Sequence, residues 1–225
     1  MTKLGKKYRD SKKLVTENNY AIAEAVALAK QTSYTKFDGT IEVAIKTFAD
    51  PKYNDQNIRA TVVLPHGTGK TQKVAVFATD ADAEAAKKAG ADIVGYETLL
   101  TDIKAGKLDF DVLVTTPGLM KELAPIAKVL WPKGLMPSPK AGTVTADITT
   151  AVNEVKKGRL EFKLDKTGNI HSKIGRTSFD DEQLVENFNT LIKAIEENKP
   201  SGVKGKLIKK IVISPTMGAW VPVSY

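Results

Sequence analysis

Apolar and polar residues change their spacing twice along the chain, and the three resulting segments predict different structures. In the first segment, residues 19–31 are rich in alanine and carry apolar positions at helical spacing, which predicts a helix. Residues 40–48 and 58–64 alternate between apolar and polar positions, which predicts two strands buried on one face only. One helix and two strands cannot enclose a hydrophobic core by themselves.

The second segment has the pattern of strands buried on both faces that alternate with helices. The runs 74–78 and 110–116 are almost continuously apolar, as strands of a parallel sheet covered on both sides require. A short strand is expected at 91–94. Helices are expected from a capping box at Thr79–Asp82 to Gly90, at 97–105, at 117–130 and at 147–157. This order predicts a Rossmann-like, three-layer α/β module.

After Gly158 the alternation returns. Residues 160–164 and 170–174 flank a tight turn at Asp165–Gly168, which predicts a β-hairpin. A cap at Ser178–Asp181 opens an amphipathic helix that runs to about Asn198, and its apolar stripe consists of Leu184, Phe188, Leu191, Ile192 and Ile195. A final strand is expected at 207–213.

The two chain ends are each too small to form a core, so we expect them to fold together. The economical solution is a two-domain α/β protein, with a discontinuous α+β domain built from residues 1–66 and 159–225. A Rossmann-like α/β domain of residues 67–158 is then inserted between its strands. Two separate small lobes are the alternative that the sequence leaves open.

Composition narrows the chemistry. The chain has 225 residues, of which 42% are apolar and 27% charged, as in ordinary globular proteins. The absence of cysteine excludes disulfides, iron–sulfur clusters and thiol nucleophiles, and two histidines are too few for a three-histidine metal site. No apolar run approaches the roughly 20 residues of a membrane helix, and no signal peptide is visible. We therefore expect a cytoplasmic protein with no metal, cofactor or membrane contact.

The net charge of +8 is distributed unevenly along the chain. Residues 67–158 hold 12 lysines against 11 acidic residues, a net charge of +1, whereas the two ends hold 22 basic and 15 acidic residues, a net charge of +7. The first 13 residues alone contribute six basic residues, Lys3 among them, and one acidic residue. Such a segment is either a frayed, solubilising terminus or an arm that seeks the phosphates of nucleic acid.

The segment Pro65–Thr71 resembles a phosphate-binding P-loop but lacks its first glycine, because Leu64 occupies that position. It is also followed by a predicted strand where a P-loop needs a helix. A flexible hinge between domains fits the segment better than a nucleotide site. The rival hypothesis is a phosphate-ligand-binding enzyme that uses the Rossmann-like module and the Gly67–Thr71 loop. Neither His66 nor His171 lies near a plausible nucleophile in the sequence, so no catalytic residue is predicted.

Three further stretches have both a structural and a nucleic-acid interpretation. Residues 131–143 are dense in proline and glycine, and form either a connecting loop or an exposed loop that carries Lys133 and Lys140 toward phosphate. Phe37 is either a core residue or a platform for a base or sugar. Residues 214–220 are either a plain strand end or a site where Gly218 lets the backbone approach RNA closely.

Taken together, the motifs resemble the family of bacterial large-subunit ribosomal protein L1. They are, in chain order, His66–Lys70, Ala89–Asp92, Lys133–Lys140 with Gly142–Val144, Asp165–Gly168 with Ile170 and His171, and Thr216–Gly218. The match runs from the basic N-terminus to Val223 without large gaps. The chain departs from the usual pattern at Trp131-Pro132, at Ser138 and at Trp220.

The resemblance implies a non-enzymatic ribosomal protein with a discontinuous RNA-binding domain and an inserted Rossmann-like domain. It implies binding to the stalk hairpin of large-subunit rRNA, assistance in the release of tRNA from the exit site, and repression of the protein's own operon through its mRNA. The protein would be a monomer when free. By motif, the implied RNA-binding residues are Lys36, Phe37, Thr40, Asp165, Lys166, Thr167, Gly168, His171, Thr216, Met217 and Gly218.

Overall fold

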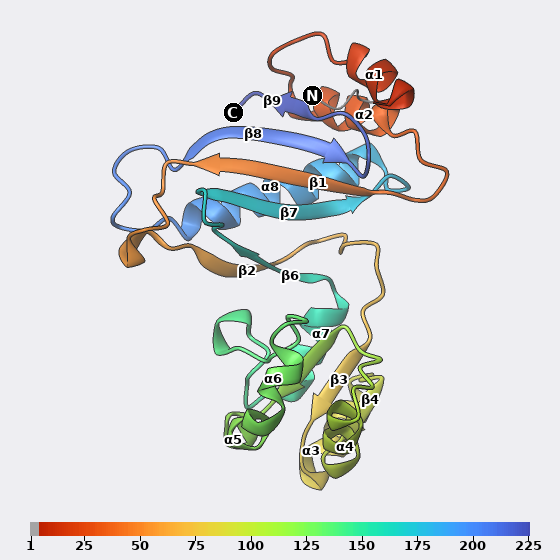
Figure 1. The fold of residues 1–225 in the computed structure, drawn as a ribbon, viewed down its shortest axis with the longest axis vertical. Helices are drawn as coiled ribbons and strands as arrows, with labels where there is room; N and C mark the ends of the chain where they lie inside the picture. Colours follow the sequence, from red (N-terminus) through yellow and green to blue (C-terminus); the bar gives the residue numbers. More distant parts are fainter. Residues whose placement is uncertain (1–4) are drawn as a thin grey trace. The chain divides into compact units, whose positions relative to one another are not determined.

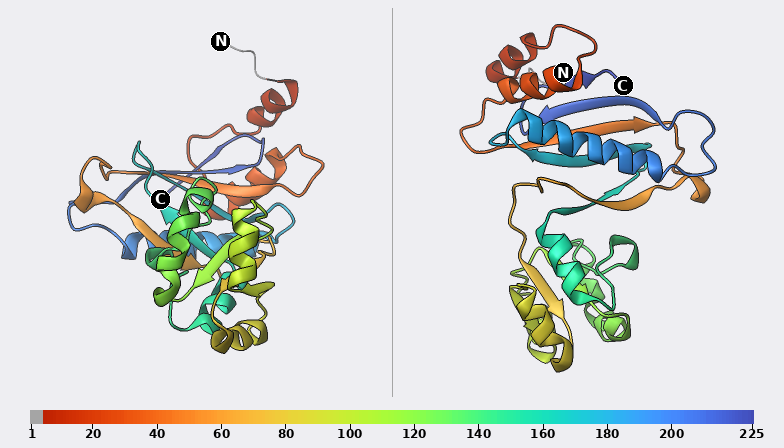
Figure 2. Two further views of the ribbon diagram at one scale, coloured as in Figure 1. Left: turned by 60° about the horizontal axis from the view of Figure 1, so that its bottom comes forward. Right: turned by 180° about the vertical axis from the view of Figure 1, so that it is seen from behind.

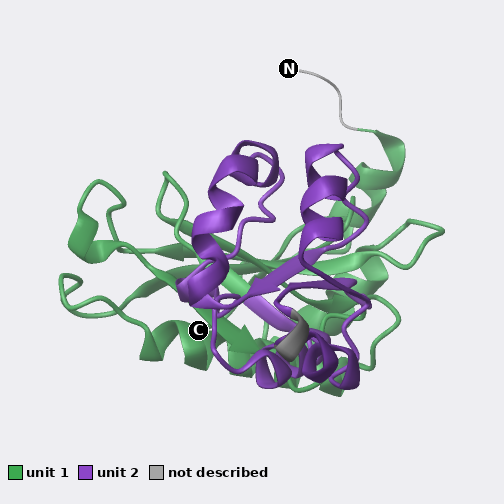
Figure 3. Ribbon diagram, turned by 90° about the horizontal axis from the view of Figure 1, so that it is seen from below, with its two compact units in different colours: residues 1–69, 161–225 green, residues 70–160 purple. Residues whose placement is uncertain are grey.

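The structure is a computed structural model that describes residues 5–225, except for the side chains of residues 80 and 81 (Figure 1). Lys3, counted in the basic N-terminal segment, lies outside the described residues. The chain forms two compact units, one made of residues 161–225 with the residues up to 69, the other of residues 70–160 (Figure 3). The mixed α/β class is confirmed. The predicted domain boundaries, 66/67 and 158/159, stay predictions. The boundaries between the two compact units fall slightly later in the chain, at 69/70 and 160/161.

The first unit contains a four-stranded antiparallel sheet with one face covered by helices (Figures 1 and 2). In spatial order the strands are β7 (Asn169–Arg176), β1 (Thr40–Thr47), β8 (Ile208–Pro215) and β9 (Val221–Val223). The covering helices are α2 (Ile22–Thr32) and α8 (Asp181–Glu197), which also contact each other. All five residues of the predicted apolar stripe of α8 are buried, as expected. Residues 6–13 of the basic segment form helix α1 (Lys6–Lys13), which contacts α2.

Strand alternation leaves the other face of this sheet toward solvent. Ile41, Val43 and Ile45 of β1 point into the core, as predicted, and the residues between them point away. We call this second surface the open face. Its residues, all exposed or half-buried, are Thr40, Glu42, Ala44, Lys46, Asn169, His171, Lys173, Lys210, Val212 and Ser214.

The predicted β-hairpin around Asp165–Gly168 is wrong in its strand pairing. The strand before the turn, β6 (Arg159–Lys163), pairs with β2 (Arg59–Val63) in a separate two-stranded sheet, whereas β7 pairs along its whole length with β1. Across the turn only Leu164 and Ile170 form a β-bridge. The reason is that Leu164 continues the pairing with the first segment, donating its N–H to the Ile58 carbonyl at 2.9 Å. The local pattern specified the turn but not the partner strands. The short turn η1 (Asn54–Gln56) precedes β2.

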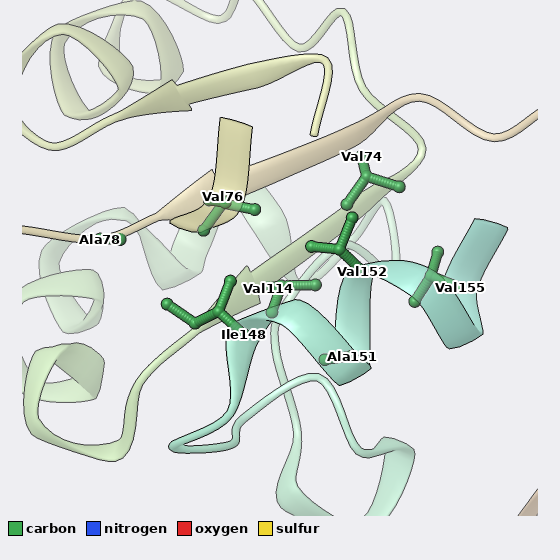
Figure 4. Close-up of a cluster of buried hydrophobic side chains, with 9 residues drawn as sticks. Val74, Val76, Ala78, Val114, Ile148, Ala151, Val152 and Val155 are labelled. Carbon is green, nitrogen blue, oxygen red and sulfur yellow. The ribbon is translucent and has the colours of Figure 1, made fainter. Parts of the chain in front are cut away.

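The second unit is a three-layer arrangement around a parallel sheet of order β4–β3–β5. These strands are Ile93–Gly95, Val74–Phe77 and Val112–Thr115, and β3 is buried on both faces, as its continuous apolar run predicted. Helices α3 (Asp80–Lys88) and α7 (Ile148–Lys156) cover one face, where Val76, Val114 and Val152 belong to one cluster (Figure 4). Helix α4 (Glu97–Lys104) and the segment 119–136 build the cluster on the other face.

Two helix predictions in the second unit need correction. The helix expected at 117–130 is broken into η2 (Pro117–Leu119), α5 (Met120–Leu123), η3 (Ala124–Ile126) and α6 (Ala127–Leu130). Pro125 explains the break, because proline lacks the N–H that would continue the helical ladder and its ring clashes with the preceding turn. The capping box at Thr79 does not form: within the described residues its side chain makes no capping hydrogen bond. In the first unit, Asp180 is the N-cap of α8, where its N–H donates to Gln183 Oε1 at 3.3 Å.

Along residues 5–225, no helix combines the length and apolar character needed to cross a membrane.

Candidate functional site

Two of the predicted site segments meet at one end of the four-stranded sheet. Strand β1 starts at Thr40 where β8 ends, so that Ile41 lies opposite Pro215. Thr40 donates its N–H to Thr216 Oγ1 at 3.0 Å, and Thr216 donates its own N–H to the Thr40 carbonyl at 2.9 Å. These reciprocal bonds join the loop before β1 to the turn after β8. We call this pair of segments, residues 36–40 and 215–218, the loop-end site.

The loop-end site holds two large apolar side chains in solvent. Phe37 is 60% exposed and Met217 is 65% exposed. Met217 has a φ of 65°, and among the described residues no other non-glycine has a positive φ. This left-handed conformation costs about 1–2 kcal/mol for an L-residue with a Cβ. A strained backbone that presents an apolar side chain to water is typical of a binding site.

Gly218 fixes the shape of the same turn. A Cβ at this position would lie 2.4 Å from Pro215 Cγ and 2.9 Å from the Thr32 carbonyl oxygen. Only glycine fits there without displacing the end of helix α2. The structure thus gives Gly218 a packing role inside the protein, which neither interpretation of residues 214–220 from the sequence included.

Asp38 organises the loop that carries Lys36 and Phe37, and the sequence reasoning missed it. Its carboxylate accepts hydrogen bonds from the Ser178 N–H at 3.0 Å, the Ser178 hydroxyl at 2.9 Å and the Thr177 hydroxyl at 2.9 Å. Although burial raises its pKa, the bonds from Ser178 and Thr177 outweigh burial and hold the pKa of Asp38 below its ordinary value. The contact residues come from more than 130 positions away in sequence, so no local signal marked Asp38.

The remaining predicted residues lie at the opposite end of the sheet, in a turn stabilised by Asp165. Its carboxylate accepts hydrogen bonds from the Thr167 N–H at 2.8 Å, the Thr167 hydroxyl at 2.8 Å and the Asn169 N–H at 2.7 Å. Burial opposes ionisation, but the bonds from Asn169 and Thr167 hold the pKa of Asp165 well below its ordinary value. Gly168 accepts two hydrogen bonds from Thr47 through its carbonyl, which anchors the turn to the end of β1.

The structure therefore does not gather the predicted residues into one cluster. The two groups are separated by the length of β1, whose eight residues at about 3.4 Å each span roughly 25 Å. The open face lies between them. His171 sits on this face opposite Ala44, and its Nε2 is 3.5 Å from Asp165 Oδ2.

The predicted residues also divide by their accessibility. The exposed side chains, which can contact a ligand, are those of Lys36, Phe37, Lys166, His171 and Met217. The hydroxyls of Thr167 and Thr216 already bond to protein groups, and Gly168 is buried. Thr40, Asp165, Thr167, Gly168, Thr216 and Gly218 thus position the backbone more than they offer side chains.

Two lysines on the open face also escaped the sequence reasoning. Lys46 of β1 lies directly opposite Lys210 of β8, and both are exposed. Lys46 donates to the Thr167 carbonyl at 2.6 Å. Within the described part of the chain, neither lysine has a carboxylate partner. Strand alternation was the available signal, since it places both residues on the solvent side.

The nucleotide-binding alternative finds no support in the segment 65–71. Lys70 is paired with Asp111 at 2.7 Å, and this hydrogen bond lowers the pKa of Asp111. The chain then enters strand β3, whereas a P-loop leads into a helix. His66 is a structural residue: its Nε2 lies 2.5 Å from Glu186 Oε2, and its backbone N–H donates to Oδ1 of the buried Asn187 at 3.1 Å. Among the described side chains, no group of histidines and carboxylates is arranged to hold a metal ion.

The loop 131–143 belongs to the second unit and exposes Trp131, Lys133 and Lys140. Leu135 and Met136 pack against the core cluster, and Ser138 donates its N–H to Thr143 Oγ1 at 2.8 Å. The loop is thus tied down locally while its lysines face solvent. This arrangement fits a connecting loop as well as a loop that carries Lys133 and Lys140 toward phosphate.

Comparison with known proteins places these features in a family. Residues 28–219 match the model of the ribosomal protein L1p/L10e family. The chain is 54% identical over 211 residues to the large ribosomal subunit protein uL1 of Streptomyces avermitilis, covering 94% of this chain and 88% of that protein. It is 53% identical over 210 residues to the protein of the same name from Streptomyces coelicolor, covering 93% and 87%.

Proposed function

The chain belongs to the ribosomal protein L1p/L10e family, and on this premise we propose that it is a non-enzymatic constituent of the large ribosomal subunit that binds rRNA directly. The loop-end site is the observation that carries the proposal. Its exposed Phe37 and strained, exposed Met217 form an apolar surface on a protein with a net charge of +8. Apolar side chains flanked by lysines suit RNA, whose unstacked bases and riboses offer apolar faces between phosphates.

We assign the binding of rRNA to the discontinuous domain of residues 1–66 and 159–225, which carries a net charge of +7. Its target is the stalk hairpin of large-subunit rRNA. Lys36 and Lys166 contact phosphates at the two ends of the sheet, while Phe37 and Met217 pack against sugars or bases. Phosphate contacts set the register on the RNA, and the apolar and backbone contacts select its shape.

The inserted domain of residues 67–158 has a net charge of only +1, which favours brief contacts with RNA over tight binding. We propose that it contacts tRNA at the exit site and assists its release. Lys133 and Lys140 on the loop 131–143 are the exposed cations that such a contact would use.

The same RNA-binding surface gives a physical route to autoregulation. If an mRNA structure of the protein's own operon resembles the rRNA hairpin, both RNAs compete for one surface. Free protein then binds and represses the mRNA only when rRNA sites are filled. On this proposal the protein is a monomer when free. The uL1 relatives support its location in the cytoplasmic ribosome.

A salt titration with a fragment of the stalk hairpin tests rRNA binding. We expect log K to fall linearly with log salt, and Lys36→Ala or Lys166→Ala to reduce that slope by about one phosphate each. The matched control is Lys104→Ala in the last turn of α4, which removes the same charge from the second unit and should leave the slope unchanged. If all three variants behave alike, the assigned surface is wrong.

Equilibrium dialysis with ATP, GTP and NAD tests the rival enzyme hypothesis. We expect no binding, because Lys70 is engaged by Asp111. Micromolar binding that is lost in Lys70→Ala would establish a nucleotide site and overturn the non-enzymatic assignment.

A further inference from the structure

Trp220 is held with its side chain on the open face. Its neighbours in the chain are both buried, Ala219 at 1% and Val221 at 0% exposure, which fixes the backbone on either side. Strand β9 pairs with β8 so that Val221 lies opposite Ile213 and Pro222 opposite Val212. Trp220 immediately precedes β9, and its ring contacts Lys210, a residue of the open face. The side chain is nevertheless 46% exposed, so the protein itself covers only about half of this large aromatic residue.

A cation lies over the indole ring of Trp220. Lys210 Nζ lies 5.5 Å from the ring centroid of Trp220, within the range of a cation–π contact. Lys210 is also directly opposite Lys46 in the sheet register, and like charges in that arrangement destabilise a sheet. An anionic ligand between these lysines would relieve the repulsion. The open face thus combines an aromatic surface with two lysines that, among the described residues, form no ion pair with a carboxylate.

We propose that Trp220 is a stacking platform for an unpaired nucleotide of the bound RNA, and that Lys210 contacts the phosphate of that nucleotide. The proposal rests on the proposed rRNA-binding function and extends it from the loop-end site along the β8–β9 edge of the open face. Trp220 follows Met217 by three residues in the same turn, so the two surfaces are continuous along the chain.

Nucleic acid fits this surface better than a protein segment. Aromatic side chains flanked by cations bind single-stranded nucleic acid because every base has a face that stacks and every nucleotide carries one phosphate. A purely apolar protein segment would instead desolvate Lys46 and Lys210 without neutralising them. Bases within a duplex are already stacked on each other, so the platform selects unpaired nucleotides.

Tryptophan fluorescence gives a direct test, because the chain contains only Trp131 and Trp220. Trp131 is 78% exposed in the second unit, so Trp131→Phe removes it at little structural cost and leaves Trp220 as the sole reporter. We titrate this variant with the rRNA stalk hairpin, and follow binding by anisotropy of labelled RNA and stacking by Trp220 emission. We expect quenching of Trp220 with the same midpoint as the anisotropy change.

The possible outcomes separate this inference from the function on which it rests. Binding by anisotropy without a change in Trp220 emission would overturn the stacking platform and leave rRNA binding intact. Absence of binding would overturn both. Equal quenching by a fully paired RNA duplex would refute selection of an unpaired nucleotide. Quenching that appears without RNA as protein concentration rises would identify a protein contact and refute the proposal.

Substitutions at Trp220 provide a second measurement. Trp220→Ala should weaken hairpin binding by about tenfold, the scale of one lost base–aromatic contact, and Trp220→Phe should restore most of the affinity. Trp131→Ala is the matched control and should bind like the parent. Thermal unfolding shows whether Trp220→Ala is folded. If the folded Ala variant binds as tightly as the parent, Trp220 does not contact RNA.

Discussion

Replacing Met217 by aspartate separates the binding role of this residue from its role in the fold. Met217 adopts a left-handed backbone conformation that aspartate and asparagine tolerate better than methionine does. Its side chain is 65% exposed, so little packing is lost on substitution. Met217→Asn makes the same change in size and backbone preference without the charge. The difference between the two variants therefore isolates the effect of a carboxylate at this site.

The expected change in stability is small because two contributions oppose each other. Full burial of a methionine stabilises by about 1.5–3 kcal/mol, and about one third of this side chain is covered, so its removal costs about 0.5–1 kcal/mol. Relief of the left-handed conformation returns up to about 1 kcal/mol. The thermal midpoint of both variants should therefore stay within about 4 °C of the parent, since 1 kcal/mol shifts it by about 2–4 °C at this size.

The expected change in RNA binding is larger and depends on charge. A carboxylate about 8 Å from a phosphate is repelled by about 0.5 kcal/mol in water and about 2 kcal/mol at an effective dielectric constant of 20. Met217→Asp should thus bind the rRNA hairpin about 2- to 30-fold more weakly than Met217→Asn in an anisotropy titration at low salt. The gap should narrow as salt rises. Equal affinities for the two variants at low salt would show that no phosphate lies near Met217 and would refute the assigned surface.

Three further substitutions test the structural framework of the site. Thr216→Val leaves the Thr40 N–H without its side-chain acceptor and should lower the free energy of unfolding, measured in urea, by about 1–3 kcal/mol. Thr216→Ser should keep the hydrogen bond and the stability of the parent, and equal stabilities of the two variants would show that the bond is dispensable. Gly218→Ala places a Cβ 2.4 Å from Pro215 Cγ and 2.9 Å from the Thr32 carbonyl, and should lower stability by about 1–3 kcal/mol; an unchanged thermal midpoint would contradict the close packing. The pKa of Asp165 is depressed in the fold, so its ionised form stabilises above the unfolded pKa of about 3.9, and this contribution is lost as pH falls from there through the folded pKa. Urea unfolding of Asp165→Asn should accordingly show a deficit against the parent at pH 7 that shrinks below pH 4, and a pH-independent deficit would contradict the assignment.

Part of the candidate site could be read from the sequence, because some signals are local. The family motifs named Phe37, Met217 and Gly218 as candidate RNA-binding residues, while the pattern of the sequence left open whether Phe37 is a core residue and whether residues 214–220 are a plain strand end. The sequence could not show that Thr216 forms hydrogen bonds with Thr40, or that the Asp38 carboxylate accepts hydrogen bonds from residues 177 and 178. These partners are distant along the chain. Nor could it show that the Asp165 turn lies at the far end of the sheet from Met217. That separation follows from strand pairing, which places β1 between β7 and β8.

By itself the sequence determined the elements whose signals lie within one element. Hydrophobic period gave the buried stripe of α8, the half-buried β1 and the doubly buried β3, because each pattern reflects which side chains of that element leave water. The break of the helix expected at 117–130 could also have been predicted, because Pro125 stands in the middle of that segment. The tertiary structure alone decided that β6 pairs with β2, and that β9 exists as a three-residue strand. It also decided that Lys46, Lys210 and Trp220 share one face. Strand pairing joins residues far apart in sequence, and its energy comes from contacts that no local pattern contains.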